Sequence, residues 1–185
     1  MDLHLSDAQA TAEERVPIDS ELYAAQAGSP DYRHQSTDAR GARELGAHGN
    51  RHLLLPILHA IQNRIGWISP GALNYLASRL DVAPAEVYGV ASFYGMFSLQ
   101  PRPSVVAQVC DDIACVTRGS DELCAELEGT LGVAGSPCAG GRAIWLRSQC
   151  LGLCERAPAV LVSSAAKVPR SECWRPRRRA VCRPW

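Results

Sequence analysis

Between residues 48 and 97 the apolar positions follow three helical stripes separated by short turn signals. Gly66 ends the first stripe, and Ser69 with Pro70 forms an N-cap and first-turn pair for the second. Pro84 opens the third. The stripes consist of Leu54, Ile57, Leu58, Ile61 and Ile65, then Leu73, Leu76, Ala77 and Leu80, then Val87, Tyr88, Val90, Ala91 and Tyr94. The pattern predicts a bundle of three short helices within residues 47–101.

The next part of the chain changes to the pattern of a mixed domain. A β-branched run over Ser104–Val109 predicts a strand that ends directly at Cys110, and Arg118–Leu131 has the spacing of a helix. Ala143–Leu146 and Ala159–Ser163 have the pattern of two further short strands. A strand, a helix and two strands predict a small α/β domain over residues 102–163. With the helical bundle before it, the fold class is α+β.

The two ends of the chain differ from this central part in composition. Residues 1–46 contain nine acidic and four basic residues and no sustained apolar period, which predicts a disordered acidic segment with at most a short helix at Ser20–Ala27. Residues 164–185 contain seven basic residues and one acidic residue, an atypical basic tail. The formal net charge is zero, and the middle of the chain is nearly neutral. The charge pattern does not favour a nucleic-acid partner.

Four cysteines in two close pairs carry the candidate chemistry. Cys110 and Cys115 form a C-x4-C pair in VCDDIAC, and Cys150 and Cys154 form a C-x3-C pair in QCLGLC. Four thiolates are the ligand set of a [2Fe–2S] cluster, two for each tetrahedral iron, and zinc takes the same set. Gly152 allows the second loop to curl through positive φ and bring both sulfurs to one side. From spacing alone, iron and zinc both remain open.

The other four of the eight cysteines are weaker candidates. Cys124 falls on an apolar helix stripe, which predicts a core thiol. Cys138 lies in GSPCAGG, where we expect a flexible loop and an alternative ligand of low weight. Cys173 and Cys182 are interpreted as incidental thiols of the tail.

The chain shows neither a secretory signal nor a membrane span. Its first residues are polar and acidic, and its longest apolar run is far shorter than the roughly 20 residues a spanning helix needs. We therefore expect a cytoplasmic protein with no direct membrane insertion. In a reducing compartment the cysteines are expected to be ligands or free thiols.

Four segments in this order resemble one known family: LLPILHAIQNRIGWIS, VAPAEVYGVASFYGMF, VCDDIAC and QCLGLCERAPAVLV. The family is the thioredoxin-like [2Fe–2S] subunit of NADH-dehydrogenase modules, found in respiratory complex I and in NAD-linked formate dehydrogenases and hydrogenases. The resemblance covers about residues 48–163. It implies a helical part followed by a thioredoxin-like ferredoxin domain, with Cys110, Cys115, Cys150 and Cys154 binding one [2Fe–2S] cluster.

The resemblance also implies a partner subunit and separate roles for the two chains. FMN and NAD would be bound by a larger subunit, and this chain would transfer single electrons without activity of its own. The sequence contains no G-x-G-x-x-G loop, which agrees with a nicotinamide site elsewhere. A stand-alone thioredoxin-like ferredoxin and a zinc-stabilised interaction module are the alternatives. The segment 48–97 argues against the first, since a simple ferredoxin needs no docking bundle.

Three features depart from the family pattern or affect its chemistry. After APAVLV the chain lacks the apolar period expected of a further strand and a C-terminal helix, so we expect both to be missing or altered. Trp145 and Arg147 precede the second cysteine pair, where more acidic residues are expected. Asp111 and Asp112 lie in the first cysteine loop, and their negative charges are expected to lower the reduction potential.

Overall fold

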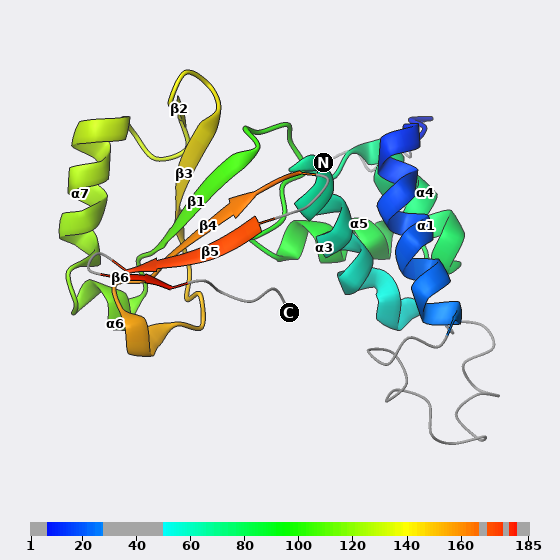
Figure 1. Ribbon diagram of the computed structural model, residues 1–185. Helices are drawn as coiled ribbons and strands as arrows, with labels where there is room; N and C mark the ends of the chain where they lie inside the picture. Colours follow the sequence, from blue (N-terminus) through cyan, green and yellow to red (C-terminus); the bar gives the residue numbers. More distant parts are fainter. Residues whose placement is uncertain (1–6, 28–49, 167–169, 176–177, 181–185) are drawn as a thin grey trace. The chain divides into compact units, whose positions relative to one another are not determined.

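The computed structural model describes residues 7–27, 50–166, 170–175 and 178–180 of the 185-residue chain; for 170–175 and 178–180 it describes the backbone only. The chain divides between Pro101 and Arg102 into two compact units (Figure 1). Within the described residues, none of the helices combines the length and apolar character that crossing a bilayer requires.

The first unit is helical, as the apolar stripes predict. Its core is formed by buried aliphatic side chains from each of its described α-helices, among them Ile18, Ile57, Ile61, Leu76 and Val87. The described elements are α1 (Ala12–Gln26), the 3-10 helix η3 (Arg51–Leu53), α3 (Leu54–Ile65), α4 (Pro70–Leu80) and α5 (Pro84–Phe93).

Turn signals in the sequence define where these helices begin and end. Gly66 follows α3 with φ of 98°, a left-handed conformation that glycine adopts without steric cost. The Ser69 hydroxyl accepts a hydrogen bond from the N–H of Ala72 and so caps α4, which starts with Pro70. These boundaries are those predicted from the sequence.

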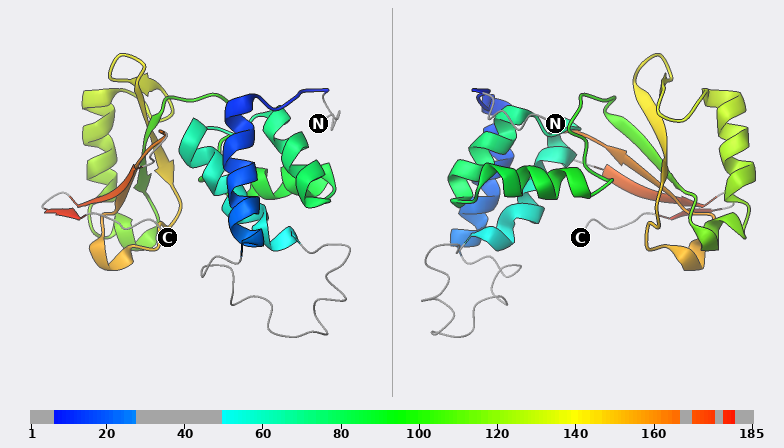
Figure 2. Two further views of the ribbon diagram at one scale, coloured as in Figure 1. Left: turned by 45° about the vertical axis from the view of Figure 1, so that its right-hand side comes forward. Right: turned by 180° about the vertical axis from the view of Figure 1, so that it is seen from behind.

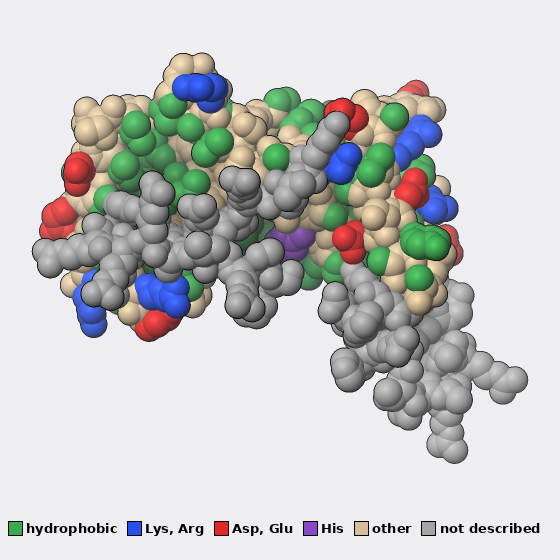
Figure 3. Space-filling model, in the orientation of Figure 1, with side chains coloured by type: hydrophobic (Ala, Val, Ile, Leu, Met, Phe, Trp, Pro, Cys, Tyr) green, Lys and Arg blue, Asp and Glu red, His purple; other side chains and the backbone are tan. Residues whose placement is uncertain are grey.

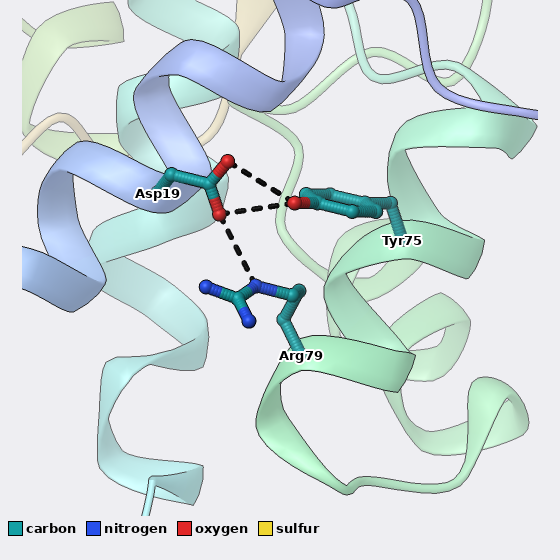
Figure 4. Close-up of polar contacts among 3 residues, drawn as sticks. All are labelled: Asp19, Tyr75 and Arg79. Atoms are coloured by element: carbon teal, nitrogen blue, oxygen red, sulfur yellow. Dashed lines mark hydrogen bonds and ion pairs between the residues drawn. The ribbon is translucent and has the colours of Figure 1, made fainter.

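Helix α1 packs on this bundle through polar as well as apolar contacts. The Tyr75 hydroxyl on α4 donates to the Asp19 carboxylate on α1, with distances of 3.0 and 3.1 Å to its two oxygens (Figure 4). Arg79, one turn further along α4, donates from Nε to the same carboxylate at 3.1 Å. Ile18 and Leu22 on α1 are buried in the core.

The prediction that residues 1–46 are disordered is therefore wrong for the part occupied by α1. The helix starts with a capping box: the N–H of Glu14 donates to the Thr11 hydroxyl, and the Glu14 carboxylate accepts from the N–H of Thr11. The short helix considered at Ser20–Ala27 is the second half of a longer one. Residues 28–46 lie outside the described part of the chain.

The second unit is a mixed sheet with one long helix beside it. The sheet order is β2-β3-β1-β4-β5-β6, with β1 parallel to β3 and the other pairs antiparallel. Both views of Figure 2 show α7 on one side of this sheet. The elements are β1 (Val105–Cys110), α6 (Ile113–Val116), α7 (Ser120–Leu131), β2 (Pro137–Cys138), β3 (Ala143–Ser148), the 3-10 helix η4 (Cys154–Arg156), β4 (Val160–Ser164), β5 (Arg170–Arg175) and β6 (Arg178–Ala180). The α+β fold class is confirmed.

Trp145 lies at the centre of the core between α7 and the sheet. Its side chain is 1% exposed and packs with Val109, Cys124 and Val160. Its indole Nε1–H donates to the Gly132 carbonyl, just after α7, at 2.8 Å. Trp145 is therefore a core residue, although its position in the sequence had suggested only that it lies near the second cysteine pair. Cys124 is a core thiol, as predicted.

A strand and a helix were expected to be missing or altered after the APAVLV segment, and of these the strand is present. β5 pairs antiparallel with β4, with Leu161 opposite Cys173, and β6 pairs with β5. The outer edge of β4 offers unpaired backbone groups, and a returning chain satisfies them without needing an apolar period. In the described residues no helix follows β4. The side chain of Cys173, and Cys182 as a whole, lie outside the described part.

Candidate functional site

The first cysteine pair lies where β1 ends. The N–H of Cys110 donates to the Ala159 carbonyl at 3.0 Å, and the N–H of Asp111 donates to the Ser148 carbonyl at 3.0 Å. The loop is thus attached to both neighbouring segments of the sheet. Cys110 and Cys115 are buried, with 2% and 1% of their surface exposed.

A short helix holds the second cysteine of this pair. Asp112 caps α6, since its carboxylate accepts from the N–H of Ile113 at 2.8 Å. The N–H of Cys115 donates to the Asp112 carbonyl at 2.8 Å. Burial raises the pKa of Cys115, while a backbone hydrogen bond from Ala159 lowers it and a thiol hydrogen bond with Cys110 raises it.

The second cysteine pair is held by a tight loop at the surface. The sulfurs of Cys150 and Cys154 are 3.5 Å apart, and both residues are exposed. Gly152 has φ of 71°, and its N–H donates to the Cys150 sulfur at 3.4 Å. The curl of the chain expected at this glycine is therefore present.

The fold brings the two pairs to the same end of the sheet. In Figures 1 and 2, α6 and η4, which contain Cys115 and Cys154, lie side by side beyond the strand ends. A hydrogen bond with Cys150 raises the pKa of Cys154, and the charge on Cys110 raises it further. Cys154 in turn raises the pKa of Cys115. The pKa of one thiol in each pair thus depends on the other pair.

The spacing within the second cysteine pair fits two ligands of one metal ion. A tetrahedral ion with bonds of about 2.3 Å to sulfur separates two ligand sulfurs by about 3.8 Å, close to the 3.5 Å between Cys150 and Cys154. Within the described ranges, no three His, Cys, Asp or Glu side chains converge closely enough to hold one ion. Four thiolates in two close pairs are the donor set of a [2Fe–2S] cluster, and zinc takes four thiolates as well.

The local structure at Cys138 differs from the prediction. It lies in β2 and pairs with Ala143 of β3, so the expected flexible loop is wrong at this residue. The peptides that follow do form a tight turn, in which Ala139, Gly140 and Gly141 have positive φ. Ala143 begins β3, whose other end, Ser148, is paired with Cys110, so Cys138 is at the opposite end of the strand from the cysteine site.

Residues 43–169 match the thioredoxin-like [2Fe-2S] ferredoxin family. The chain belongs to this family. The match spans the helices α3 to α5 and all four paired cysteines, so the resemblance carried by the four sequence segments is confirmed.

Several relatives of this ferredoxin are components of NADH-quinone oxidoreductases. Subunit 2 of the enzyme from Thermus thermophilus is 34% identical over 126 residues, which are 68% of each chain. A subunit of the NADH-quinone oxidoreductase from Aquifex aeolicus is 36% identical over 114 residues, 61% of this chain and 71% of the relative. An NAD+-reducing [NiFe]-hydrogenase chain of known crystal structure, in the air-oxidized state, is 27% identical with a TM-score of 0.49, covering 60% of this chain and 19% of that one.

Two features of the site in this ferredoxin were not predicted from the sequence. The Ala159 backbone hydrogen-bonds both Cys110 and Cys115, which requires β4 to lie beside the first loop. Arg147 lies within 4 Å of the Asp111 carboxylate, so it is near the first cysteine loop in space although it precedes the second in sequence. Neither contact has a local sequence signal, because each joins segments more than 30 residues apart.

Proposed function

We propose that this chain is the electron-transfer subunit of an NADH-oxidising flavoprotein module and that Cys110, Cys115, Cys150 and Cys154 hold one [2Fe–2S] cluster. The observation that carries the proposal is the pairing of four thiols at one end of the sheet, two buried and two exposed. When bound, the cluster stores and releases one electron at a time. The family and the names of the relatives support the same assignment.

The residues of the chain have distinct roles in this site. Ala159 supplies a backbone hydrogen bond to Cys115, and Gly152 supplies one to Cys150. Such bonds stabilise thiolate charge. The apolar neighbours of Cys110 and Cys115 exclude water from their side of the site, and exposed Cys150 and Cys154 leave the other side open to a redox partner.

The partner we propose is a larger subunit that binds FMN and NAD. It would accept the hydride, and this chain would take electrons singly from the flavin, with no activity in isolation. We further propose that the module works in the cytoplasm, where its complex can associate peripherally with a membrane.

Substitution of single cysteines tests the ligand assignment. Each of the four Cys→Ser variants, purified anaerobically, is expected to lose most of its iron and sulfide. Cys138→Ser is the matched control and is expected to keep the content of the parent chain, because Cys138 lies at the far end of β3. Full cluster content in any one ligand variant would remove that cysteine from the assignment.

The partner is tested by the route of reduction. NADH alone is expected to leave the visible spectrum of the loaded chain unchanged. NADH with a catalytic amount of an FMN-containing, NADH-oxidising subunit is expected to bleach it, as dithionite does. Bleaching by NADH alone would contradict the assignment of NAD to another subunit.

A further inference from the structure

Arg147 lies among three carboxylates beside the first cysteine loop. Its Nη1 is 3.9 Å from Asp111 Oδ2 and 3.9 Å from Asp121 Oδ1, and its Nη2 is 3.6 Å from Glu128 Oε1. One guanidinium charge thus faces three negative charges. Acidic side chains are visible over α7 at the edge of the molecule in Figure 3.

The strand register positions Arg147 at this point. β1 and β3 are parallel, with Val109 opposite Arg147 and Cys110 opposite Ser148. Asp111 follows Cys110 directly and is tied to β3 by the hydrogen bond from its N–H to the Ser148 carbonyl. The charge of Asp111 is therefore fixed next to the first cysteine and next to Arg147.

The other two carboxylates belong to α7. Asp121 and Glu128 are seven residues apart, two turns of helix, and so lie on one face. Arg147 consequently connects the cysteine loop to α7. All four charges affect the pKa of the buried Cys124 thiol on that helix. Burial raises this pKa, the charge of Arg147 lowers it, and the three carboxylates raise it.

The distances and the exposure of the side chains show how the contacts of Arg147 with the three carboxylates can act. The Arg147 side chain is 42% exposed and those of its partners 33–61%, and no contact is shorter than 3.6 Å. Such surface ion pairs contribute little to stability. A fixed charge nevertheless acts on a nearby redox centre through its field, which extends about 8 Å at physiological ionic strength.

We propose that Arg147 is a positioning residue that offsets the charge of Asp111 and so raises the reduction potential of the site formed by Cys110 and its three partner cysteines. The inference rests on the proposed function. A cluster held by these cysteines would gain a negative charge on reduction, and the neighbouring carboxylates would oppose that gain. Without Arg147, no positive charge would offset the negative charge of Asp111, which opposes reduction.

The test is the midpoint potential of the loaded full-length protein. Arg147→Gln is expected to shift the potential to more negative values, with a change of up to about tenfold in the equilibrium constant for reduction, which corresponds to about 59 mV for one electron. Arg147→Lys keeps the charge and is expected to retain most of the parent potential. High salt is expected to shrink the difference.

Arg142 is the matched control. It is exposed and precedes β3, and its Nε donates to the Ala139 carbonyl at 3.3 Å. Five residues of strand place it about 16 Å from Arg147, well beyond the screening length. Arg142→Gln removes the same charge and is expected to leave the potential unchanged.

Asp111→Asn completes a double-mutant cycle. Alone, it is expected to raise the potential, and in combination with Arg147→Gln it is expected to cancel most of the negative shift. If the single variant Arg147→Gln loses its cluster, two results of this cycle still test the proposal. Asp111→Asn must raise the reduction potential, and the double variant must bind the cluster again.

The outcomes separate this inference from the proposed function. A parent chain that binds no [2Fe–2S] cluster would overturn both. A loaded parent whose potential is the same in Arg147→Gln, or shifts equally in Arg142→Gln, would overturn the role of Arg147 and leave the proposed function standing.

Discussion

The close approach of the N-terminal segment to α4 at Gly71 gives a sharp prediction about the helical unit. A Cβ at this position would lie 2.5 Å from the Gln9 carbonyl oxygen, 2.6 Å from its carbon and 2.9 Å from the Ala10 nitrogen. Ordinary contact begins at 3.4 Å, so the segment must move by about 0.9 Å. Such a shift would also disturb the hydrogen bond from Asn74 Nδ2 to the Ala8 carbonyl at 3.1 Å.

We expect Gly71→Ala to destabilise this unit by about 1–2 kcal/mol. Overpacking against rigid backbone costs about 1–3 kcal/mol, and the better helix propensity of alanine returns up to about 1 kcal/mol. Gly89→Ala in α5 is the matched control. No atom lies within 4 Å of its added Cβ, so this change is expected to stabilise by about 0.5–1 kcal/mol.

The assay is urea denaturation of the full-length protein, followed by circular dichroism at the helix band. The two variants are expected to shift the midpoint in opposite directions. Equal stability of Gly71→Ala and Gly89→Ala would refute the placement of residues 8–10 on α4, and with it the docking of α1 that replaces the predicted disorder.

Three further predictions concern the core and the cysteine loops. Ile57→Ala, at a fully buried position, is expected to cost about 2–5 kcal/mol in the same urea assay; a cost below about 1 kcal/mol would count against the helical core. Trp145→Phe removes the hydrogen bond to the Gly132 carbonyl, so a loss of about 0.5–1.5 kcal/mol is expected for the second unit, read by near-ultraviolet circular dichroism. An unchanged midpoint would contradict this. Gly152→Ala places an alanine in a left-handed backbone conformation, at a cost of about 1–2 kcal/mol. This variant is expected to lose iron to a chelator faster than Gly89→Ala does. Equal rates would argue against a role for the curl of the loop.

The helical boundaries followed from the sequence because their signals are local. Gly66 and Ser69 with Pro70 specify an end and a start irrespective of what packs on them. The capping box of Thr11 and Glu14 is equally local, yet the acidic composition around it suggested disorder. What holds α1 is its packing on distant helices, as in the contact of Asp19 with Tyr75, which a single-sequence pattern does not reveal.

The four paired cysteines could likewise be identified as candidate ligands from their spacing. That the two pairs lie at the same end of the sheet follows from the strand topology. Cys110 ends β1 and the second loop follows β3, and parallel neighbours end at the same edge of a sheet. The presence of β5 could not be predicted, because it pairs with β4 through backbone hydrogen bonds, which form irrespective of the side-chain pattern. The surroundings of Arg147 also depend on register, since a shift by one residue would turn it to the other face.

The central claim is that the four paired cysteines hold one [2Fe–2S] cluster. Its most direct test is iron and acid-labile sulfide content, with visible and electron paramagnetic resonance spectra, on full-length protein purified anaerobically. Two irons and two sulfides per chain, with a rhombic signal on reduction, are the predicted result. Zinc in place of iron, or a folded chain with neither metal nor sulfide, would contradict the account.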